Sequence, residues 1–135
     1  LPIVASQGGN TGAQALAIAI RGLATGELTS GCAWRVLRKE LLSGLLNGIA
    51  IAVIAALAVL VIHGSAPLAT VIGLAMLVSM VVAGVAGSGI PLILRLLGRD
   101  PAQSSSIFLT TVTDTVGFAS FLGFAVVFSN WLTVG

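Results

Sequence analysis

The chain has 135 residues, of which 57% are hydrophobic and only 7% are charged, and its mean hydropathy is +1.14. A soluble domain typically carries about a quarter charged residues, so this composition excludes a water-soluble globular protein and is typical of a chain embedded in lipid. The net charge is +2, from six basic and four acidic residues, and the single cysteine, Cys32, excludes an internal disulfide.

The chain begins at Leu1 without an initiator methionine and inside an apolar pattern, so we expect it to be part of a longer protein. Residues 1–23 are not expected to be a signal peptide, because they lack a basic start and have a polar, glycine-rich centre.

Four segments are predicted to be membrane-spanning helices: residues 1–23, 41–62, 68–97 and 104–131. Each is long enough for a hydrocarbon core of about 30 Å, which needs about 20 helical residues. A helix is favoured over a strand because an apolar run of this length must satisfy its backbone hydrogen bonds internally. The predicted fold class is therefore all-α, a polytopic transmembrane helical bundle.

All six basic residues lie at the ends of the first and third segments or in the junctions that follow them: Arg21, Arg35, Arg38, Lys39, Arg95 and Arg99. In an up-and-down path both junctions lie on one side of the membrane, and the positive-inside rule makes this the cytoplasmic side. The other connection, residues 63–67, has no Lys or Arg. We therefore expect a multi-pass protein of the plasma (inner) membrane.

Small residues in the third segment predict close helix packing. Gly84 and Ser88 are four residues apart, as are Ala83 and Gly87. Such spacing places small side chains on one helix face, where they let another helix approach closely.

Of the four acidic residues, only Asp114 lies inside a predicted span, because Glu27, Glu40 and Asp100 lie in the basic junctions. An acid at the membrane centre costs about 2.5–3.5 kcal/mol on insertion scales and almost always faces a bundle interior or a watery path. No Lys or Arg lies in the centre of a predicted span to neutralise it. We interpret Asp114 as functional; the alternative is a carboxylate that only hydrogen-bonds neighbouring hydroxyls or another helix.

Oxygen atoms gather around this acid. Ser106, Thr110 and Asp114 are spaced by four residues and share one face of a helix. Oxygen ligands suit hard cations such as Mg²⁺ and Ca²⁺, whereas a Zn²⁺ or Cu⁺ site is not expected with so few His, Cys and Met. Thr111 and Gly117 are further candidates for lining an ion path.

A second polar cluster occupies residues 6–14 of the first segment. Gln7, Asn10 and Gln14 follow helical spacing and can share a face. Asn10 and Gln14 are candidate path-lining residues, and the alternative is a polar contact between helices. Asn47, in the second segment, is expected to form an interhelical contact rather than to be a ligand.

Four motifs together resemble the MgtE family of magnesium transporters and channels: GGNTGAQ (8–14), RGLATGE (21–27), DPA (100–102) and TTVTD (110–114). Their order and spacing match over essentially the whole chain. The resemblance implies a homodimer with five membrane helices per subunit, the first of which would be missing here. Cytoplasmic regulatory domains would also be missing, and residues 1–135 would be one transmembrane ion-conducting domain.

The resemblance also implies roles for single residues. The family's pore runs along the dimer axis, and its key acid, in the last helix, corresponds to Asp114. The backbone carbonyl of Thr110 would face the ion path, and Asn10 would lie near its cytoplasmic end. Ser106 stands where the family often has Asn, so a side-chain amide role does not carry over to that position.

The leading hypothesis is therefore passive conduction of Mg²⁺, expected to remain largely hydrated, through a pore shared by two subunits. Glu27 and Asp100 are candidates for ion contacts at the cytoplasmic mouth. Oxygen ligands alone do not choose among Mg²⁺, Mn²⁺, Co²⁺ and Ca²⁺.

Two alternatives are an ion-coupled exchanger, in which Asp114 would titrate, and a structural membrane subunit. An intramembrane protease built on Ser88 is not expected, because the only histidine, His63, lies in the outer loop with no sign that it reaches Ser88. We therefore expect no enzyme and no nucleic-acid partner; the expected partners are a second copy, the lipid bilayer and the regulatory domains.

Overall fold

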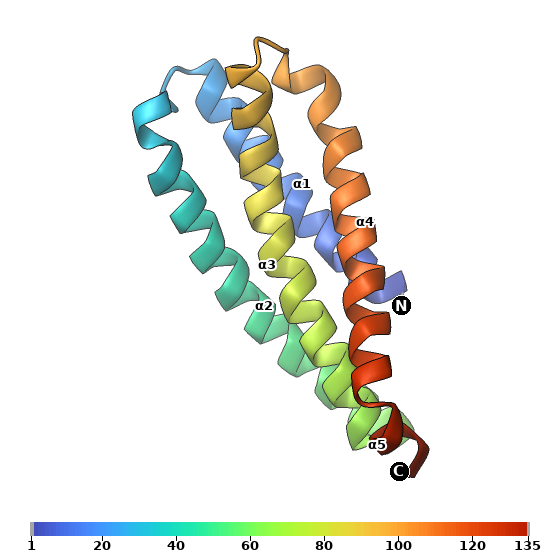
Figure 1. The fold of residues 1–135 in the computed structure, drawn as a ribbon. Helices are drawn as coiled ribbons and strands as arrows, with labels where there is room; N and C mark the ends of the chain where they lie inside the picture. The colour runs from blue at the N-terminus through green and yellow to red at the C-terminus, as the bar shows by residue number, and fades with distance from the viewer. Residues whose placement is uncertain (1, 135) are drawn as a thin grey trace.

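The structure, a computed structural model, describes residues 2–134, which form helices joined by short turns (Figure 1). In chain order the elements are α1 (Pro2–Ala24), the 3₁₀ helix η1 (Ser30–Cys32), α2 (Ala33–His63), α3 (Ala66–Leu96), α4 (Pro101–Val127) and α5 (Ser129–Val134). Residues 2–134 contain no strand, which confirms the predicted all-α fold class.

Three of the four predicted spans are confirmed as helices long and apolar enough to cross a membrane: α2, α3 and α4. The first is a helix of 23 residues, α1, but it does not reach the same hydropathy. Its polar residues 6–14 lower the average. The structure thus gives α1 spanning length with a polar centre, and its crossing of the membrane stays a prediction.

Helix boundaries differ from the predicted spans at two places. The second helix begins at Ala33, before the expected residue 41, because its first turns carry charged residues that are helical without being apolar. The last predicted span, 104–131, is divided: α4 ends at Val127, and the short helix α5 follows. Hydropathy marks where a helix meets lipid, so it does not report these charged or interfacial helix ends.

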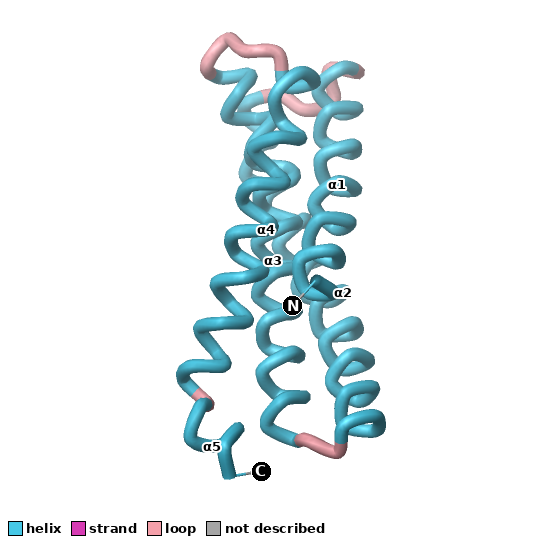
Figure 2. Tube along the Cα trace, turned by 90° about the vertical axis from the view of Figure 1, so that its right-hand side faces the viewer, coloured by secondary structure: helices cyan, strands magenta, loops and turns pink. Residues whose placement is uncertain are grey.

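The long helices run up and down, with the α1–α2 and α3–α4 connections at one end and the α2–α3 turn at the other (Figures 1 and 2). Both basic junctions therefore lie at the same end of the bundle, which we call the basic end. α3 is central: it packs against α1, α2 and α4, and α1 also packs against α4.

Glycines bring the helices around α3 into backbone contact. A Cβ atom added at Gly84 would lie 3.1 Å from the carbonyl oxygen of Glu40 on α2. On another side of α3, Gly87 lies directly against the backbone of Gly12 on α1. The predicted packing function of the small residues in this segment is thereby confirmed.

The α2–α3 turn is short because one of its residues caps the end of α2 and the next caps the start of α3. Gly64 has φ 65° and ends α2 in the left-handed conformation, which glycine adopts without steric cost. The next residue, Ser65, is the N-cap of α3, and its hydroxyl accepts the backbone N–H of Leu68 at 3.4 Å.

Candidate functional site

α4 presents two different stripes along its length. Its buried residues recur at every fourth position on the side of α1 and α3: Ser105, Leu109, Thr113 and Gly117. Beside them runs a stripe that no other described helix covers fully. We call it the open stripe; it consists of Ser106 and Thr110, which are exposed, and Asp114, which is partly buried.

The Asp114 carboxylate forms no hydrogen bond or salt bridge with another residue in the range 2–134. Hydroxyls close to it in sequence bond elsewhere. Thr110 Oγ1 donates to the carbonyl oxygen of Ser106 at 2.8 Å, and Thr111 Oγ1 donates to that of Ile107 at 2.9 Å. These bonds argue against the alternative in which neighbouring hydroxyls hold the carboxylate, and they leave its oxygens free for a ligand or water.

The two oxygens of Thr110 differ in their capacity to accept further hydrogen bonds. Its backbone carbonyl accepts the Thr113 hydroxyl at 3.2 Å, and helix geometry also directs the N–H of Asp114 to it. A carbonyl oxygen has two lone pairs, so both are engaged. The Thr110 hydroxyl donates its proton to Ser106 but keeps acceptor capacity. Among these atoms the hydroxyl oxygen is the better-placed acceptor, and contact between the carbonyl and an ion stays a prediction.

The polar residues of α1 face away from the bundle core. Gly8 and Gly12 are buried against α3 and α4, whereas Asn10 and Gln14 are exposed. Two residues correspond to about 200° around a helix, so these amides lie opposite the buried glycines. Within the described chain no hydrogen bond joins them to Asp114, and a shared path stays a prediction.

Gly117 and Thr111 were the other candidates for lining the path. Gly117 is buried, and a Cβ there would lie 3.2 Å from Cα of Ala5 on α1. This contact gives Gly117 a packing function between α1 and α4. Thr111 is exposed, next to the open stripe.

The two candidate mouth residues, Glu27 and Asp100, both lie exposed at the basic end. Glu27 lines a cavity of about 420 Å³ together with basic side chains. Asp100 caps α4, because its Oδ1 accepts the backbone N–H of Ala102 at 2.9 Å. The Asp-Pro pair at 100–101 is a helix-start signal that the sequence analysis overlooked.

Other polar residues are explained by the helices that carry them. Ser88 is fully buried, and its hydroxyl donates to the carbonyl oxygens of Gly84 and Val85 at 3.1 and 3.2 Å, which is a packing arrangement rather than that of a nucleophile. Within residues 2–134 Asn47 does not form the expected interhelical hydrogen bond: it is exposed, and its Nδ2 donates to Ser43 Oγ on the same helix at 3.4 Å.

Residues 2–134 contain no group of three or more His, Cys, Asp or Glu side chains placed to hold a metal ion. The carboxylate of Asp114 therefore stands alone in the middle of α4. A cation beside it would need further oxygens from hydroxyls, water or another chain.

Comparison with known proteins places this site in a family. The family model MgtE, described as a divalent cation transporter, matches residues 1–124. Proteins named magnesium transporter MgtE are similar over nearly the whole chain: that of Enterococcus faecalis is 34% identical over 131 residues (97% of this chain), that of Bacillus subtilis 30% over 132 residues (98%), and that of Thermus thermophilus 33% over 125 residues (93%).

The matched region covers 29%, 29% and 28% of these three relatives, so the chain spans less than a third of their length. The family match covers most of the chain and includes both polar clusters and Asp114. The chain belongs to the MgtE family of divalent cation transporters.

Proposed function

We propose that this chain forms the ion-conducting part of a protein that carries Mg²⁺ across the plasma membrane. The observation that carries the proposal is Asp114, a membrane-depth carboxylate with no partner in the described chain, on the open stripe of α4. The relatives named magnesium transporters support the choice of ion.

Two copies of the chain would complete the site. One chain supplies a single carboxylate at this depth, whereas two around a shared axis balance the charge of one divalent cation. The exposed polar stripe of α4 and the exposed amides of α1 supply surfaces that a second subunit can cover. The pore would therefore lie between subunits rather than within one bundle.

Mg²⁺ would pass largely hydrated. The ion dehydrates reluctantly and usually keeps several waters, so the carboxylates would hold it through its water shell. The hydroxyl oxygens of Ser106 and Thr110 would accept hydrogen bonds from those waters along the stripe. Pore width then contributes to selectivity.

The membrane potential is sufficient to drive import. An inside-negative potential of 100 mV favours entry of a divalent cation by about 4.6 kcal/mol, twice the value for a single charge. Transport through such a path is passive and needs no nucleotide. Gating is assigned to cytoplasmic domains outside this chain, by analogy with the family.

The test is Mg²⁺ flux into liposomes that contain the purified protein, measured with an enclosed Mg²⁺-sensitive dye. Asp114→Ala should reduce flux to the level of protein-free liposomes while gel filtration shows a folded protein of unchanged size. Thr115→Ala, an exposed change on the same helix but off the open stripe, is the matched control and should retain flux. Undiminished flux in Asp114→Ala would refute the proposal.

The same liposomes distinguish a channel from an ion-coupled exchanger. A channel responds to the Mg²⁺ gradient and to voltage, whereas an exchanger is driven by a pH or Na⁺ gradient imposed without a Mg²⁺ gradient. We expect flux to follow voltage, and net uptake driven by a pH or Na⁺ gradient alone would assign the exchanger instead.

A further inference from the structure

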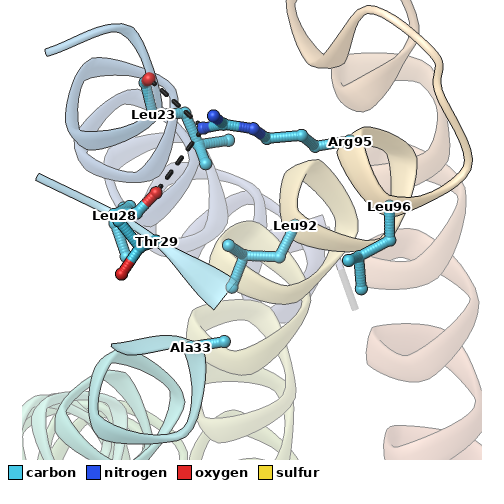
Figure 3. A pocket seen from close by; sticks show the side chains of 7 residues that line it. All are labelled: Leu23, Leu28, Thr29, Ala33, Leu92, Arg95 and Leu96. Carbon is cyan, nitrogen blue, oxygen red and sulfur yellow. Dashed lines mark hydrogen bonds between the residues drawn. The ribbon is translucent and has the colours of Figure 1, made fainter. Parts of the chain in front are cut away.

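Arg95 connects two helix ends at the basic end of the bundle. It lies in the last turn of α3, and its Nη1 donates to the carbonyl oxygens of Leu23 and Leu28, at 3.3 and 3.5 Å (Figure 3). The last carbonyls of a helix lack partners within that helix, so Arg95 satisfies one at the end of α1 and holds the following turn.

The guanidinium retains binding capacity after these bonds. Its Nη2 and Nε donate to no residue in the described range, and no carboxylate lies within salt-bridge distance of it there. Asp100 lines a separate cavity of about 270 Å³ beside Arg95 without forming a salt bridge to it. A planar guanidinium with free N–H groups is suited to bind a phosphate through two hydrogen bonds.

The larger cavity at Arg95 has an apolar wall. Its volume is about 460 Å³, and it is formed at the α1–α2 turn and the end of α3 (Figure 3). The residues that line it besides Arg95 are Leu23, Leu28, Thr29, Ala33, Leu92 and Leu96. One cation in a cavity whose other lining residues, apart from Thr29, are apolar matches a ligand with an anionic head and a hydrocarbon tail.

The position of the cavity indicates which amphiphile it meets. All six basic residues lie at this end, which the positive-inside rule places at the cytoplasmic membrane surface. Anionic lipids are attracted to such clusters, and basic pockets between membrane helices bind their headgroups. A free anion would leave the apolar wall uncovered, whereas a phospholipid covers it with an acyl chain.

We propose that this cavity binds an anionic phospholipid, with its phosphate on Arg95 and an acyl chain along Leu92 and Leu96. The lipid would add a bridge between α3 and the α1–α2 turn, which Arg95 already joins. The site is separate from the open stripe and does not depend on the transported ion.

The test is native mass spectrometry of the delipidated protein in detergent, with phosphatidylglycerol and phosphatidylcholine of equal chain length as probes. We expect one phosphatidylglycerol per chain to bind about fivefold more tightly, the ratio given by one basic residue at a membrane surface. Arg95→Gln should abolish this preference. Arg38→Gln removes a charge at the same end without touching the cavity and should keep it.

A second variant separates lipid binding from the structural function of Arg95. Ala33→Phe fills the cavity and leaves the hydrogen bonds of Arg95 in place, so it should lower phosphatidylglycerol binding. Ala58→Phe, on the exposed side of the same helix, should not. Equal binding of the two lipids, full preference in Arg95→Gln or Ala33→Phe, or displacement of the lipid by inorganic phosphate would each overturn the proposal.

Discussion

α2 and α4 both pack against α3, yet their exposed surfaces differ in the polar residues that they carry. The exposed residues of α2 beyond its charged first turns are largely apolar and include Leu46, Ile54 and Val61, which are 68%, 63% and 83% exposed. α4 exposes Ser106 and Thr110 and partly exposes Asp114 among its apolar residues. Two helices of similar length in one bundle therefore require different surroundings.

In a membrane protein, an exposed apolar face and an exposed carboxylate have different requirements. An apolar face is satisfied by lipid and needs no protein partner. A carboxylate at the same depth would cost about 2.5–3.5 kcal/mol against lipid, so the stripe of α4 needs water or another subunit.

The largest effect is expected when an acid is added to the apolar exposed face of α2. Ile54→Asp places a carboxylate on the exposed face of α2 and should destabilise the protein by about 2.5–3.5 kcal/mol, because lipid cannot solvate the charge. Thermal unfolding in detergent and the membrane-inserted yield measure it, with Ile54→Leu as control. A stable, fully inserted Ile54→Asp protein would mean that water also reaches α2.

The buried face of α4 should lose stability when side-chain volume is added to it. Gly117→Ala places a methyl group against the backbone of Ala5 and should lower stability by about 1–3 kcal/mol through overpacking. Gly123→Ala, where no atom lies within 4 Å of the added Cβ, is the matched control and should not destabilise. Equal unfolding temperatures for the two variants would contradict the close α1–α4 contact.

Hydroxyls on the open stripe should matter for transport and little for folding. Thr110→Val removes an acceptor and should reduce Mg²⁺ flux about two- to tenfold, the effect of about 0.5–1.4 kcal/mol from one neutral hydrogen bond. Ser106→Ala should act in the same range. Thr111→Val, beside the stripe, should reduce flux less; if all three variants transport as the wild type does, the stripe does not line the path.

The smallest effect is expected at the polar residue of the apolar helix. Among the described residues the Asn47 side chain hydrogen-bonds only Ser43, on its own helix, so Asn47→Leu should change stability by no more than about 0.5 kcal/mol and leave Mg²⁺ flux unchanged. Flux measurements and thermal unfolding of the same preparation check both. A marked loss of flux would show that α2 also borders the ion path.

Features that depend on composition and local spacing could be predicted from the sequence. The helical class, the apolar spans α2 to α4 and the small-residue contacts of Gly84 and Gly87 follow from hydropathy and spacing. The start of α2 at Ala33 was missed because its charged first turns resemble a loop on a hydropathy scale. The Asp-Pro pair at residues 100–101 predicts the helix cap at Asp100, but this signal was overlooked.

Features that depend on the path of a turn could not be predicted. Arg95 reaches Leu23 and Leu28 only because the α1–α2 turn carries both carbonyls to the end of α3. The surroundings of Asp114 are a similar case, since the sequence places the acid on a helix but not the direction in which neighbouring hydroxyls donate. Whether Asn10 and Asp114 meet depends on a second chain, which one sequence does not position.

The glycine contacts have a mechanical consequence. Gly12 contacts Gly87, and Ala5 contacts Gly117, so the backbones of α1, α3 and α4 lie close together, and we expect these three helices to move as a unit. In the proposed dimer, the width of the ion path would depend on the distance between these helices of one subunit and those of the other. A signal from outside the membrane would then change this distance by moving α1, α3 and α4 of each subunit together, without changing how they pack.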